Sequence, residues 1–344
     1  MAKRTKRDRA KRPSMQDVAD LASVSKTTVS FVINEVPGSN IPPETQERVW
    51  KAVRKLDYRP NIMARNLRRQ RSHTIGFVSD RVATTPYGGN MIQGAQDAAW
   101  EQELILLMVN TQDDLEIETA AVRMMLDRQV EGIIYASWYH RVANPPRAML
   151  EVPAVLLDCY SEDGAFPSVV PDEIRGGREA TEALLQKGHR RIGFINNSDP
   201  VPATFGRLQG YKDALASFGV PYDEALVCAK ESVAEGGYRG TLELMQLPDP
   251  PTALFCFCDR MAMGTYDALR RLNLSIPGDV AVMGFDNQQF IASNLYPALS
   301  TMELPHYEMG VRAARLLMDQ MDGLEDEAPS QHRVLCPFIE RESV

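Results

Sequence analysis

The chain has 344 residues, of which 44% are hydrophobic, so it is long enough for two or three domains. Its net charge of -8 is unevenly distributed along the chain. Residues 1–72 hold 17 Lys and Arg against 7 Asp and Glu (net +10), whereas residues 73–344 hold 21 Lys and Arg against 39 Asp and Glu (net -18). Only the first part therefore suits a polyanionic partner. No apolar run follows the basic start, and the longest apolar run, residues 104–109, is too short to span a bilayer, so we expect neither a secretory signal nor a membrane span.

Residues 1–12 are predicted to form a basic, disordered tail. Seven basic side chains lie within residues 3–12, with no apolar run among them. Such a tail adds nonspecific contacts to phosphates, or it is merely solvated, and the sequence leaves both possibilities open.

The next segment has the pattern of two short helices joined by a tight turn. Ser14 and Asp17 give the S-x-x-D start of a helix over residues 15–22, and Ser25 can cap a second helix after the turn. The predicted apolar stripes are Val18, Leu21 and Ala22 on the first helix and Val29, Val32 and Ile33 on the second. We therefore predict a helix-turn-helix, with an ordinary helical hairpin as the alternative.

The second helix presents a polar face at its N-terminal end. This face consists of Ser25, Lys26, Thr27, Thr28, Ser30, Phe31 and Asn34. Short hydroxyls and one Lys in a first turn suit the DNA major groove, where N-terminal residues reach base edges. We expect Lys26 and Thr27 to discriminate bases and the hydroxyl and amide residues to contact phosphates mainly.

A third helix is predicted to begin at residues 41–45 and to end near Leu56, closing a three-helix core with Val49, Trp50 and Val53. The motifs V-S-x-x-T-V-S-x-V-x-N at residues 24–34 and Y-x-P-N-x-x-A-x-x-L at residues 58–67 resemble those of the LacI/GalR family of bacterial transcription repressors. The similarity continues along nearly the whole chain from about residue 13.

This resemblance implies an all-α helix-turn-helix headpiece (residues 13–59), a hinge helix or linker (60–71) and a two-lobed α/β core (72–344) with parallel sheets, similar to periplasmic binding proteins. It also implies a homodimer on near-palindromic double-stranded operator DNA. In the hinge, the resemblance assigns Leu67 to a wedge in the minor groove and Ala64 to the contact with the partner hinge. A Leu67 that docks on its own domain is the alternative.

From residue 72 onward, short apolar runs alternate with amphipathic segments, which predicts parallel α/β lobes. Strands are predicted at residues 75–78, 104–109, 132–136, 154–157, 192–195, 226–228, 253–257 and 280–285. Helices are predicted near residues 90–102, 115–129, 176–187, 206–218, 236–247, 261–272 and 306–321. We expect a first lobe of about residues 72–171 and 304–333, and a second of about 172–303 and 334–344.

Ligands of such sheets bind at the carboxyl ends of the strands, so the loops that face a cleft between the lobes are the candidate effector site. The resemblance implies that Asp158, Arg207 and Asp286 hydrogen-bond sugar hydroxyls, and Tyr87 or Trp138 can stack on a sugar ring. Each residue also has a structural alternative, because the acids can cap helices and Arg207 can pair with an acid.

Three residues depart from the family pattern. Cys258 stands where relatives often have a ligand-binding Asn, Glu173 follows Asp172 where Asp-Asn is common, and Phe31 stands where several relatives have a base-reading Arg. The identities of the effector and the operator therefore do not transfer from relatives.

No catalytic, metal or cofactor site is predicted. The five His are scattered, no G-x-S-x-G or P-loop occurs, and the five Cys lack disulfide or zinc spacing, although Cys256 and Cys258 are expected to share one face of a strand. A cytoplasmic, nucleoid-associated regulator controlled by a sugar is the prediction. A solute-binding protein of a transport system and a co-repressor-dependent regulator with a non-sugar ligand are the alternatives.

Overall fold

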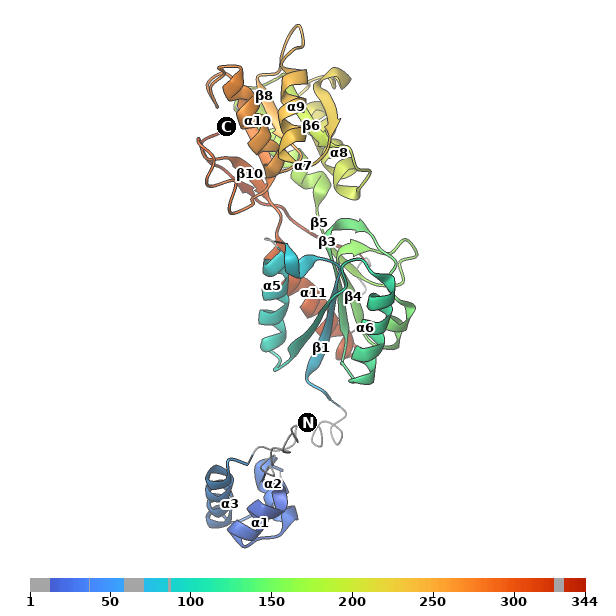
Figure 1. The fold of residues 1–344 in the computed structure, drawn as a ribbon, viewed down its shortest axis with the longest axis vertical. Coiled ribbons are helices and arrows are strands. Elements are labelled where there is room, and N and C mark those ends of the chain that lie inside the picture. The colour runs from blue at the N-terminus through green and yellow to red at the C-terminus, as the bar shows by residue number, and fades with distance from the viewer. Residues whose placement is uncertain (1–12, 37, 59–70, 86–87, 325–330) are drawn as a thin grey trace, which may run out of the picture. The chain divides into compact units, whose positions relative to one another are not determined.

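The computed structural model describes residues 13–36, 38–58, 71–85, 88–324 and 331–344 (Figure 1). The chain divides into two compact units, Met1–Ser72 and His73–Val344, which we call the headpiece and the core. Three candidate site residues, Ala64, Leu67 and Tyr87, lie outside the described residues, as does the predicted tail.

The headpiece contains three helices, α1 (Met15–Ala22), α2 (Lys26–Ile33) and α3 (Pro43–Leu56). Helix α1 begins at a capping box in which the Ser14 backbone N–H donates to Asp17 Oδ2 at 2.7 Å and the Asp17 N–H donates back to Ser14 Oγ. Helix α2 begins where Ser25 Oγ accepts the Thr28 N–H at 3.0 Å. The local signals in the sequence therefore define both starts.

The buried cluster of the headpiece confirms the predicted apolar stripes except at one residue. Its buried residues are Val18, Ala19, Ala22, Val29, Val32, Val49, Ala52 and Tyr58. Ile33, Trp50, Val53 and Leu56 are partly buried against this cluster. Leu21, in contrast, is 43% exposed, because Ala19 rather than Leu21 shares the buried face of α1 with Val18 and Ala22.

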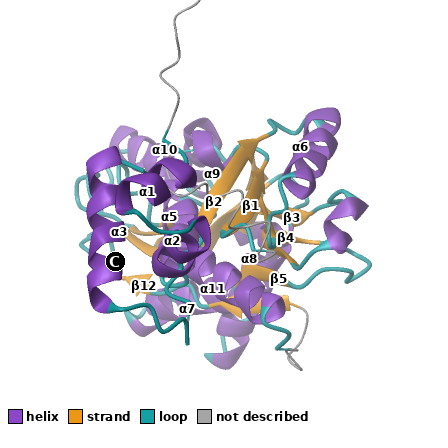
Figure 2. Cartoon of the chain, turned by 90° about the horizontal axis from the view of Figure 1, so that it is seen from below, coloured by secondary structure: helices purple, strands orange, loops and turns teal. Residues whose placement is uncertain are grey.

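The first lobe of the core is a six-stranded parallel sheet in the order β11-β5-β4-β3-β1-β2. Its strands are β1 (Thr74–Ser79), β2 (Ile105–Asn110), β3 (Ile133–Val142), β4 (Ala154–Tyr160), β5 (Ser168–Pro171) and β11 (Gln331–Val334), with short 3-10 turns η1 (Val82–Thr84) and η2 (Arg147–Glu151). Helices α5 (Gly88–Trp100) and α11 (His306–Met321) cover one face, and α6 (Leu115–Asp127) covers the other (Figures 1 and 2).

The second lobe is a six-stranded sheet in the order β12-β10-β9-β8-β6-β7, in which only β12 is antiparallel to its neighbour. Its strands are β6 (Ile192–Asn197), β7 (Val227–Lys230), β8 (Ala253–Cys256), β9 (Ala281–Asp286), β10 (Ser300–Glu303) and β12 (Phe338–Ile339). Its helices are α7 (Glu173–Gln186), α8 (Pro202–Ser217), α9 (Ala234–Leu244) and α10 (Asp259–Arg271), with a 3-10 turn η3 (Glu224–Leu226).

The chain passes between the lobes after β5, after β10 and after β11, so each lobe is assembled from separate segments. The two-lobed, mainly parallel architecture confirms the predicted fold class. Strands β5, β10, β11 and β12 were not predicted. Each of these strands has four residues or fewer and therefore gives only a short hydrophobic pattern, although β7 and β8, which are also four residues long, were predicted.

Two local predictions for the core were wrong. Strand β8 ends at Cys256, and Cys258 is the N-cap of α10, so the two sulfurs do not share a strand face. Asp158 was expected in the loop after a strand but lies inside β4, with a positive φ of 56°. That backbone conformation is uncommon for a residue other than glycine.

Candidate functional site

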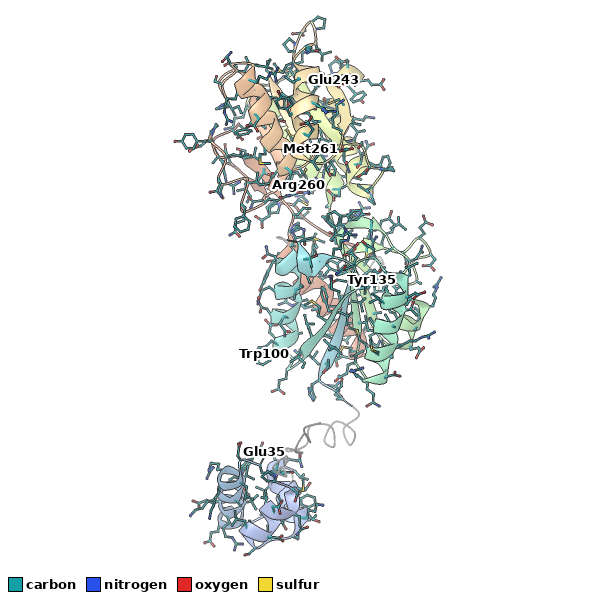
Figure 3. The ribbon with its side chains drawn as sticks, viewed as in Figure 1. Glu35, Trp100, Tyr135, Glu243, Arg260 and Met261 are labelled. Carbon is teal, nitrogen blue, oxygen red and sulfur yellow. The ribbon has the colours of Figure 1, made fainter. Side chains whose placement is uncertain are left out.

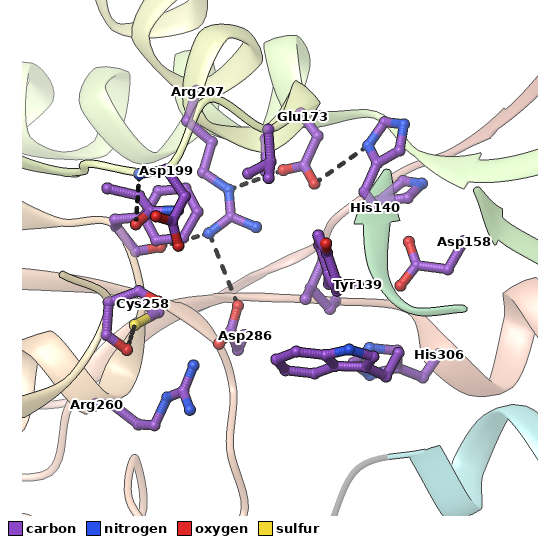
Figure 4. Close-up of a pocket in the computed structure, with 18 of the residues that line it drawn as sticks. Tyr139, His140, Asp158, Glu173, Asp199, Arg207, Cys258, Arg260, Asp286 and His306 are labelled. Atoms are coloured by element: carbon purple, nitrogen blue, oxygen red, sulfur yellow. Dashed lines mark hydrogen bonds and ion pairs between the residues drawn. The ribbon is translucent and has the colours of Figure 1, made fainter. Parts of the chain in front are cut away.

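Figure 3 draws the side chains of the two lobes of the core, and a cavity of about 450 Å³ lies between these lobes (Figure 4). It is lined by Trp138, Tyr139, His140, Asp158, Pro171, Glu173, Asn197, Asp199, Pro200, Val201, Ala203, Arg207, Ser232, Phe257, Cys258, Arg260, Asp286, Leu304 and His306. In the first lobe these residues lie on β3, β4 and β5. In the second lobe they lie at or after the ends of β6, β7, β8 and β9 and on helices α7, α8 and α10, and Leu304 and His306 lie where the chain crosses between the lobes after β10. Such a volume is suited to a small molecule.

Arg207 on α8 is the most constrained cation of this cavity. Its guanidinium carbon lies 3.6 Å from the ring centroid of Phe285 and 4.3 Å from that of Phe257. Its Nε donates to Glu173 Oε2 at 2.8 Å, and its Nη1 donates to the Phe257 carbonyl and lies 3.7 Å from Asp286 Oδ1. Figure 4 shows the two carboxylates approaching Arg207 from different sides. The rings and acids therefore define the plane of the guanidinium group.

Glu173 links Arg207 to the first lobe. It is the first residue of α7, and its second oxygen lies 3.6 Å from His140 Nδ1 on β3. Burial raises the pKa of Glu173, but the charge of Arg207 and the contact with His140 outweigh burial, and the pKa falls to about 2. Glu173 therefore stays ionised throughout the physiological pH range.

Asp158 has the opposite electrostatic character. Its side chain is buried, and its Oδ1 has no hydrogen-bond partner among the described residues. Burial, and then the charges of Glu173 and Asp80, raise the pKa of Asp158 well above its ordinary value. An unpaired buried carboxyl oxygen is costly, so a ligand hydroxyl at this atom would be stabilising.

Asp286 lies at the end of β9, in a backbone conformation with a φ of 105°. Its Oδ2 accepts a hydrogen bond of 2.9 Å from Gln288 Nε2. Burial raises the pKa of Asp286 to about 6, although Arg207 acts in the opposite direction. This carboxylate is therefore ionised near neutral pH at an energetic cost.

Trp138 and Tyr139 form an aromatic wall on β3, with ring centroids 4.8 Å apart in an edge-to-face arrangement. The backbone N–H of Trp138 donates to Asp80 Oδ1 at 3.1 Å, and Asp80 Oδ2 forms an ion pair with Arg141 at 3.1 Å. This buried network holds β3 against the end of β1, which positions the wall.

Four of the five predicted effector residues, Trp138, Asp158, Arg207 and Asp286, line one cavity, although they are as much as 148 positions apart (138 to 286). The fifth, Tyr87, lies outside the described residues. Sequence reasoning did not select several other lining residues, among them Tyr139, His140, Glu173 and Phe257. For Glu173 a signal existed, since it was noted as a departure from the family pattern.

In the headpiece, the candidate DNA-binding residues lie on and next to α2. Lys26, Thr27 and Phe31 are exposed, and Phe31 is 38% exposed and outside the apolar core. Ser25 caps the start of α2, while Asn34 Nδ2 donates to the Ser30 carbonyl at 2.7 Å. Ser25 and Asn34 therefore stabilise the ends of the helix whether or not they contact phosphates.

Within the described ranges, no group of three or more His, Cys, Asp and Glu side chains is arranged to hold a metal ion. The helices in those same ranges include none with the length and apolar character needed to cross a bilayer.

Comparison with known proteins identifies the family of the chain. The model for "Bacterial regulatory proteins, lacI family" matches residues 14–61, and the model for "Periplasmic binding protein-like domain" matches residues 181–344. The transcriptional regulator RegA of Clostridium saccharobutylicum is 34% identical over 336 residues, which cover 96% of this chain and 98% of RegA.

Two solved structures extend the comparison. The transcriptional regulator CelR in complex with cellobiose is 30% identical with a TM-score of 0.66, covering 97% of this chain and 100% of CelR. The lac repressor dimer bound to operator and the anti-inducer ONPF has a TM-score of 0.78 at 23% identity, covering 97% and 99% of the two chains, and it supports the fold. The chain belongs to the lacI family of bacterial regulatory proteins and is a transcription regulator with a DNA-binding headpiece and an effector-binding core.

Proposed function

We propose that this protein is a repressor whose operator affinity is controlled by a sugar or sugar derivative bound in the cavity between the core lobes. The observation that carries the proposal is the unpaired Oδ1 of Asp158 in a cavity that also contains Arg207 and Asp286. Acceptors on both lobes and a fixed guanidinium suit the alternating hydroxyls of a sugar, and the wall of Trp138 and Tyr139 suits a ring face. A regulator of chromosomal genes acts in the cytoplasm.

The cellobiose complex of the relative CelR supports this effector class. Because the ligand would contact both lobes, its binding favours one closure angle of the core. We propose that closure is transmitted to the operator through the hinge (60–71), with Leu67 and Ala64 in the roles that the family implies. We propose that effector binding lowers operator affinity and releases the DNA, as in catabolic regulators. Co-repression, in which the effector raises operator affinity, is the alternative.

Linkage provides the test of this control. We expect that the effector dissociation constant changes roughly 5- to 150-fold when saturating operator is present, and that the effector changes operator affinity by the same factor. A thermal-shift screen of sugars, nucleosides and polyols identifies the ligand, since saturation at 100 times the dissociation constant adds about 2.7 kcal/mol. Calorimetric titrations with and without operator then measure the coupling. Equal dissociation constants for every ligand of this cavity would show that the cavity does not regulate DNA binding.

We propose a homodimer that uses one side of the first lobe. Strand β2 is the edge of its sheet, and both β2 and α6 expose large apolar side chains. The exposed residues are Ile105, Met108, Leu115, Ile117 and Met124. A symmetric partner would cover this face, and the dimeric state of the lac repressor supports the proposal.

For DNA recognition we propose that Lys26, Thr27 and Phe31 contact bases while Ser25, Thr28, Ser30 and Asn34 mainly hold the helix and phosphates. Selection from a randomised library should return near-palindromic sites, because a two-fold dimer presents two identical helices. Thr27→Ala should change the ranking of half-sites, with individual preferences shifting by about 1 to 3 kcal/mol.

The matched control is Ser30→Ala, one turn further along α2. Ser30→Ala removes the hydroxyl that is assigned to phosphates and that accepts a 3.3 Å hydrogen bond from Asn34 Nδ2, but keeps the backbone carbonyl bond, so it should weaken all sites together. A Thr27→Ala variant that ranks a half-site library as the parent does would refute the assignment of Thr27.

A further inference from the structure

The side chain of Glu173 occupies a space prepared by the packing of α7 on α8. A Cβ atom at Gly206 would lie 2.6 Å from the Cβ of Glu173, so glycine at 206 is what allows the two helices to enclose this side chain. Only 5% of Glu173 is exposed, and the ion pair with Arg207 fixes one oxygen while His140 approaches the other. Helix packing and the ion pair with Arg207 therefore hold the side chain of Glu173 in the cavity wall.

Glu173 also uses the part of Arg207 that would otherwise bind an acidic ligand. Arginine recognises carboxylates and phosphates through paired N–H groups. Among the described residues, the hydrogen bonds and ion pairs of Arg207 all run through Nε and Nη1, to Glu173, Phe257 and Asp286. The Nη2 amino group makes none of these contacts, so it is the group left to donate to a neutral oxygen, whereas an anion that pairs with both Nη1 and Nη2 has to compete with Phe257 and Asp286 at Nη1.

Carboxyl groups also outnumber guanidinium groups in the cavity lining. Among the described residues that line it, four carry carboxyl groups and two carry guanidinium groups: Asp158, Glu173, Asp199 and Asp286 against Arg207 and Arg260. A ligand anion beside Arg207 would lie close to Glu173, and like charges at such distances in a partly dehydrated site repel strongly.

We propose that Glu173 determines the effector class by acting as a built-in counter-ion of Arg207, so that the cavity admits uncharged polyhydroxyl rings and rejects analogues that carry a carboxylate or phosphate. This inference rests on the proposed function, because it concerns the ligand of the same cavity. It assigns specificity to a position that departs from the family pattern.

Matched neutral and acidic sugars test the proposal on the full-length protein. The probes are glucose with glucuronate, cellobiose with cellobionate, and ribose with ribose 5-phosphate, measured by thermal shift and calorimetry. For any neutral sugar that binds, we expect the acidic partner to bind at least about 100-fold more weakly. In Glu173→Gln, which keeps the side-chain volume but removes the charge, this ratio should fall below about 10-fold. An acidic sugar that binds the parent as tightly as its neutral partner, or a ratio unchanged in Glu173→Gln, overturns the proposal.

A second arm needs no sugar. Glu173→Ala leaves a carboxylate-sized space beside Arg207, so sodium formate should raise its Tm more than the same concentration of sodium chloride does. The parent and Glu179→Ala, which alters a half-buried glutamate of the same helix that is paired with Arg175, should respond equally to both salts. Glu173→Ser is the second variant if the alanine variant does not fold.

The absence of a formate-specific rise in the folded variant contradicts the role of Glu173. If no sugar binds the parent but formate stabilises the variant, the proposed effector class fails and the counter-ion role stands.

Discussion

Gly94→Ala is expected to lower the free energy of unfolding of the core by about 3 kcal/mol. Gly94 lies where α5 crosses α11, and a Cβ there would overlap the backbone oxygen of Tyr307 and lie 3.1 Å from the Val311 nitrogen. Gly310 occupies the opposite side of the same crossing, with its own Cβ position against the backbone of Met91 and Ala95. Because the obstructing atoms are backbone, the helices would have to separate. Urea denaturation followed by far-ultraviolet circular dichroism measures the loss.

The control for this variant is Gly89→Ala in the same helix. A Cβ at Gly89 would meet no heavy atom within 4 Å, and Gly89 is exposed. The substitution should therefore raise the unfolding free energy by about 0.5 kcal/mol, since alanine loses less backbone entropy than glycine on forming a helix. Equal urea midpoints for Gly94→Ala and the parent would show that the α5–α11 contact can relax without cost.

Local signals explain why the headpiece could be predicted closely. The Ser14–Asp17 capping box lies entirely within four residues, and the residues of α1 were predicted correctly from it. Leu21 shows where such reasoning fails. On a helix of two turns, Leu21 and Ala19 are both compatible with an apolar stripe next to Val18 and Ala22, and only the packing against α2 and α3 decides which of them is buried.

In the core, the alternation of strands and helices was predictable, and the starts of α6 and α11 agree with the predicted positions 115 and 306, but the starts of the other helices were predicted late. Predicted starts fell two to four residues late for α7 to α10, at 176, 206, 236 and 261 against the observed 173, 202, 234 and 259. At α8 the first turn contains Pro202 at a position where proline is tolerated, which the apolar pattern does not reveal.

The site was predictable residue by residue but not as a set of interactions. Arg207 and Asp286 were selected as ligand residues, yet the contacts of Arg207 with Glu173, Asp286 and the Phe257 and Phe285 rings depend on how α8 packs against α7 and on where β8 and β9 end. The alternative that Arg207 pairs with an acid agrees with its ion pairs to Glu173 and Asp286. No sequence pattern indicates the unpaired oxygen of Asp158 or the φ of 56° that this residue adopts within a strand.

Asp286→Asn is expected to stabilise the core at pH 8 while it weakens effector binding. Burial raises the pKa of Asp286 from 3.8 to about 6, so the folded protein binds this proton more tightly than the unfolded chain does. Ionisation of Asp286 therefore costs stability: the cost is absent below about pH 3.8, grows as the pH rises to about 6 and is complete above that value. Removing the charge should recover roughly 1 to 3 kcal/mol at pH 8.

Asparagine is a suitable replacement because it tolerates the positive φ of this position and retains an oxygen for Gln288. It does not provide the charged acceptor, however, so effector affinity should fall about 10- to 100-fold, since a hydrogen bond to a charged group contributes about 1.5 to 3 kcal/mol. Urea midpoints of variant and parent from pH 4 to pH 8 give the stability difference, and effector titration at pH 8 gives the affinity.

The matched control is Asp279→Asn, an exposed aspartate of the same lobe whose pKa is lowered by hydrogen bonds from the side chain and backbone of Ser275. Its ionised form is favoured by folding, so its replacement should not stabilise the protein at pH 8 and should leave effector affinity unchanged. If the gain of Asp286→Asn is the same at pH 4 and pH 8, it does not arise from ionisation of this carboxyl group. If effector affinity is also retained, Asp286 contributes neither charge nor a hydrogen bond to the ligand, and its conformation at the end of β9 serves the fold alone.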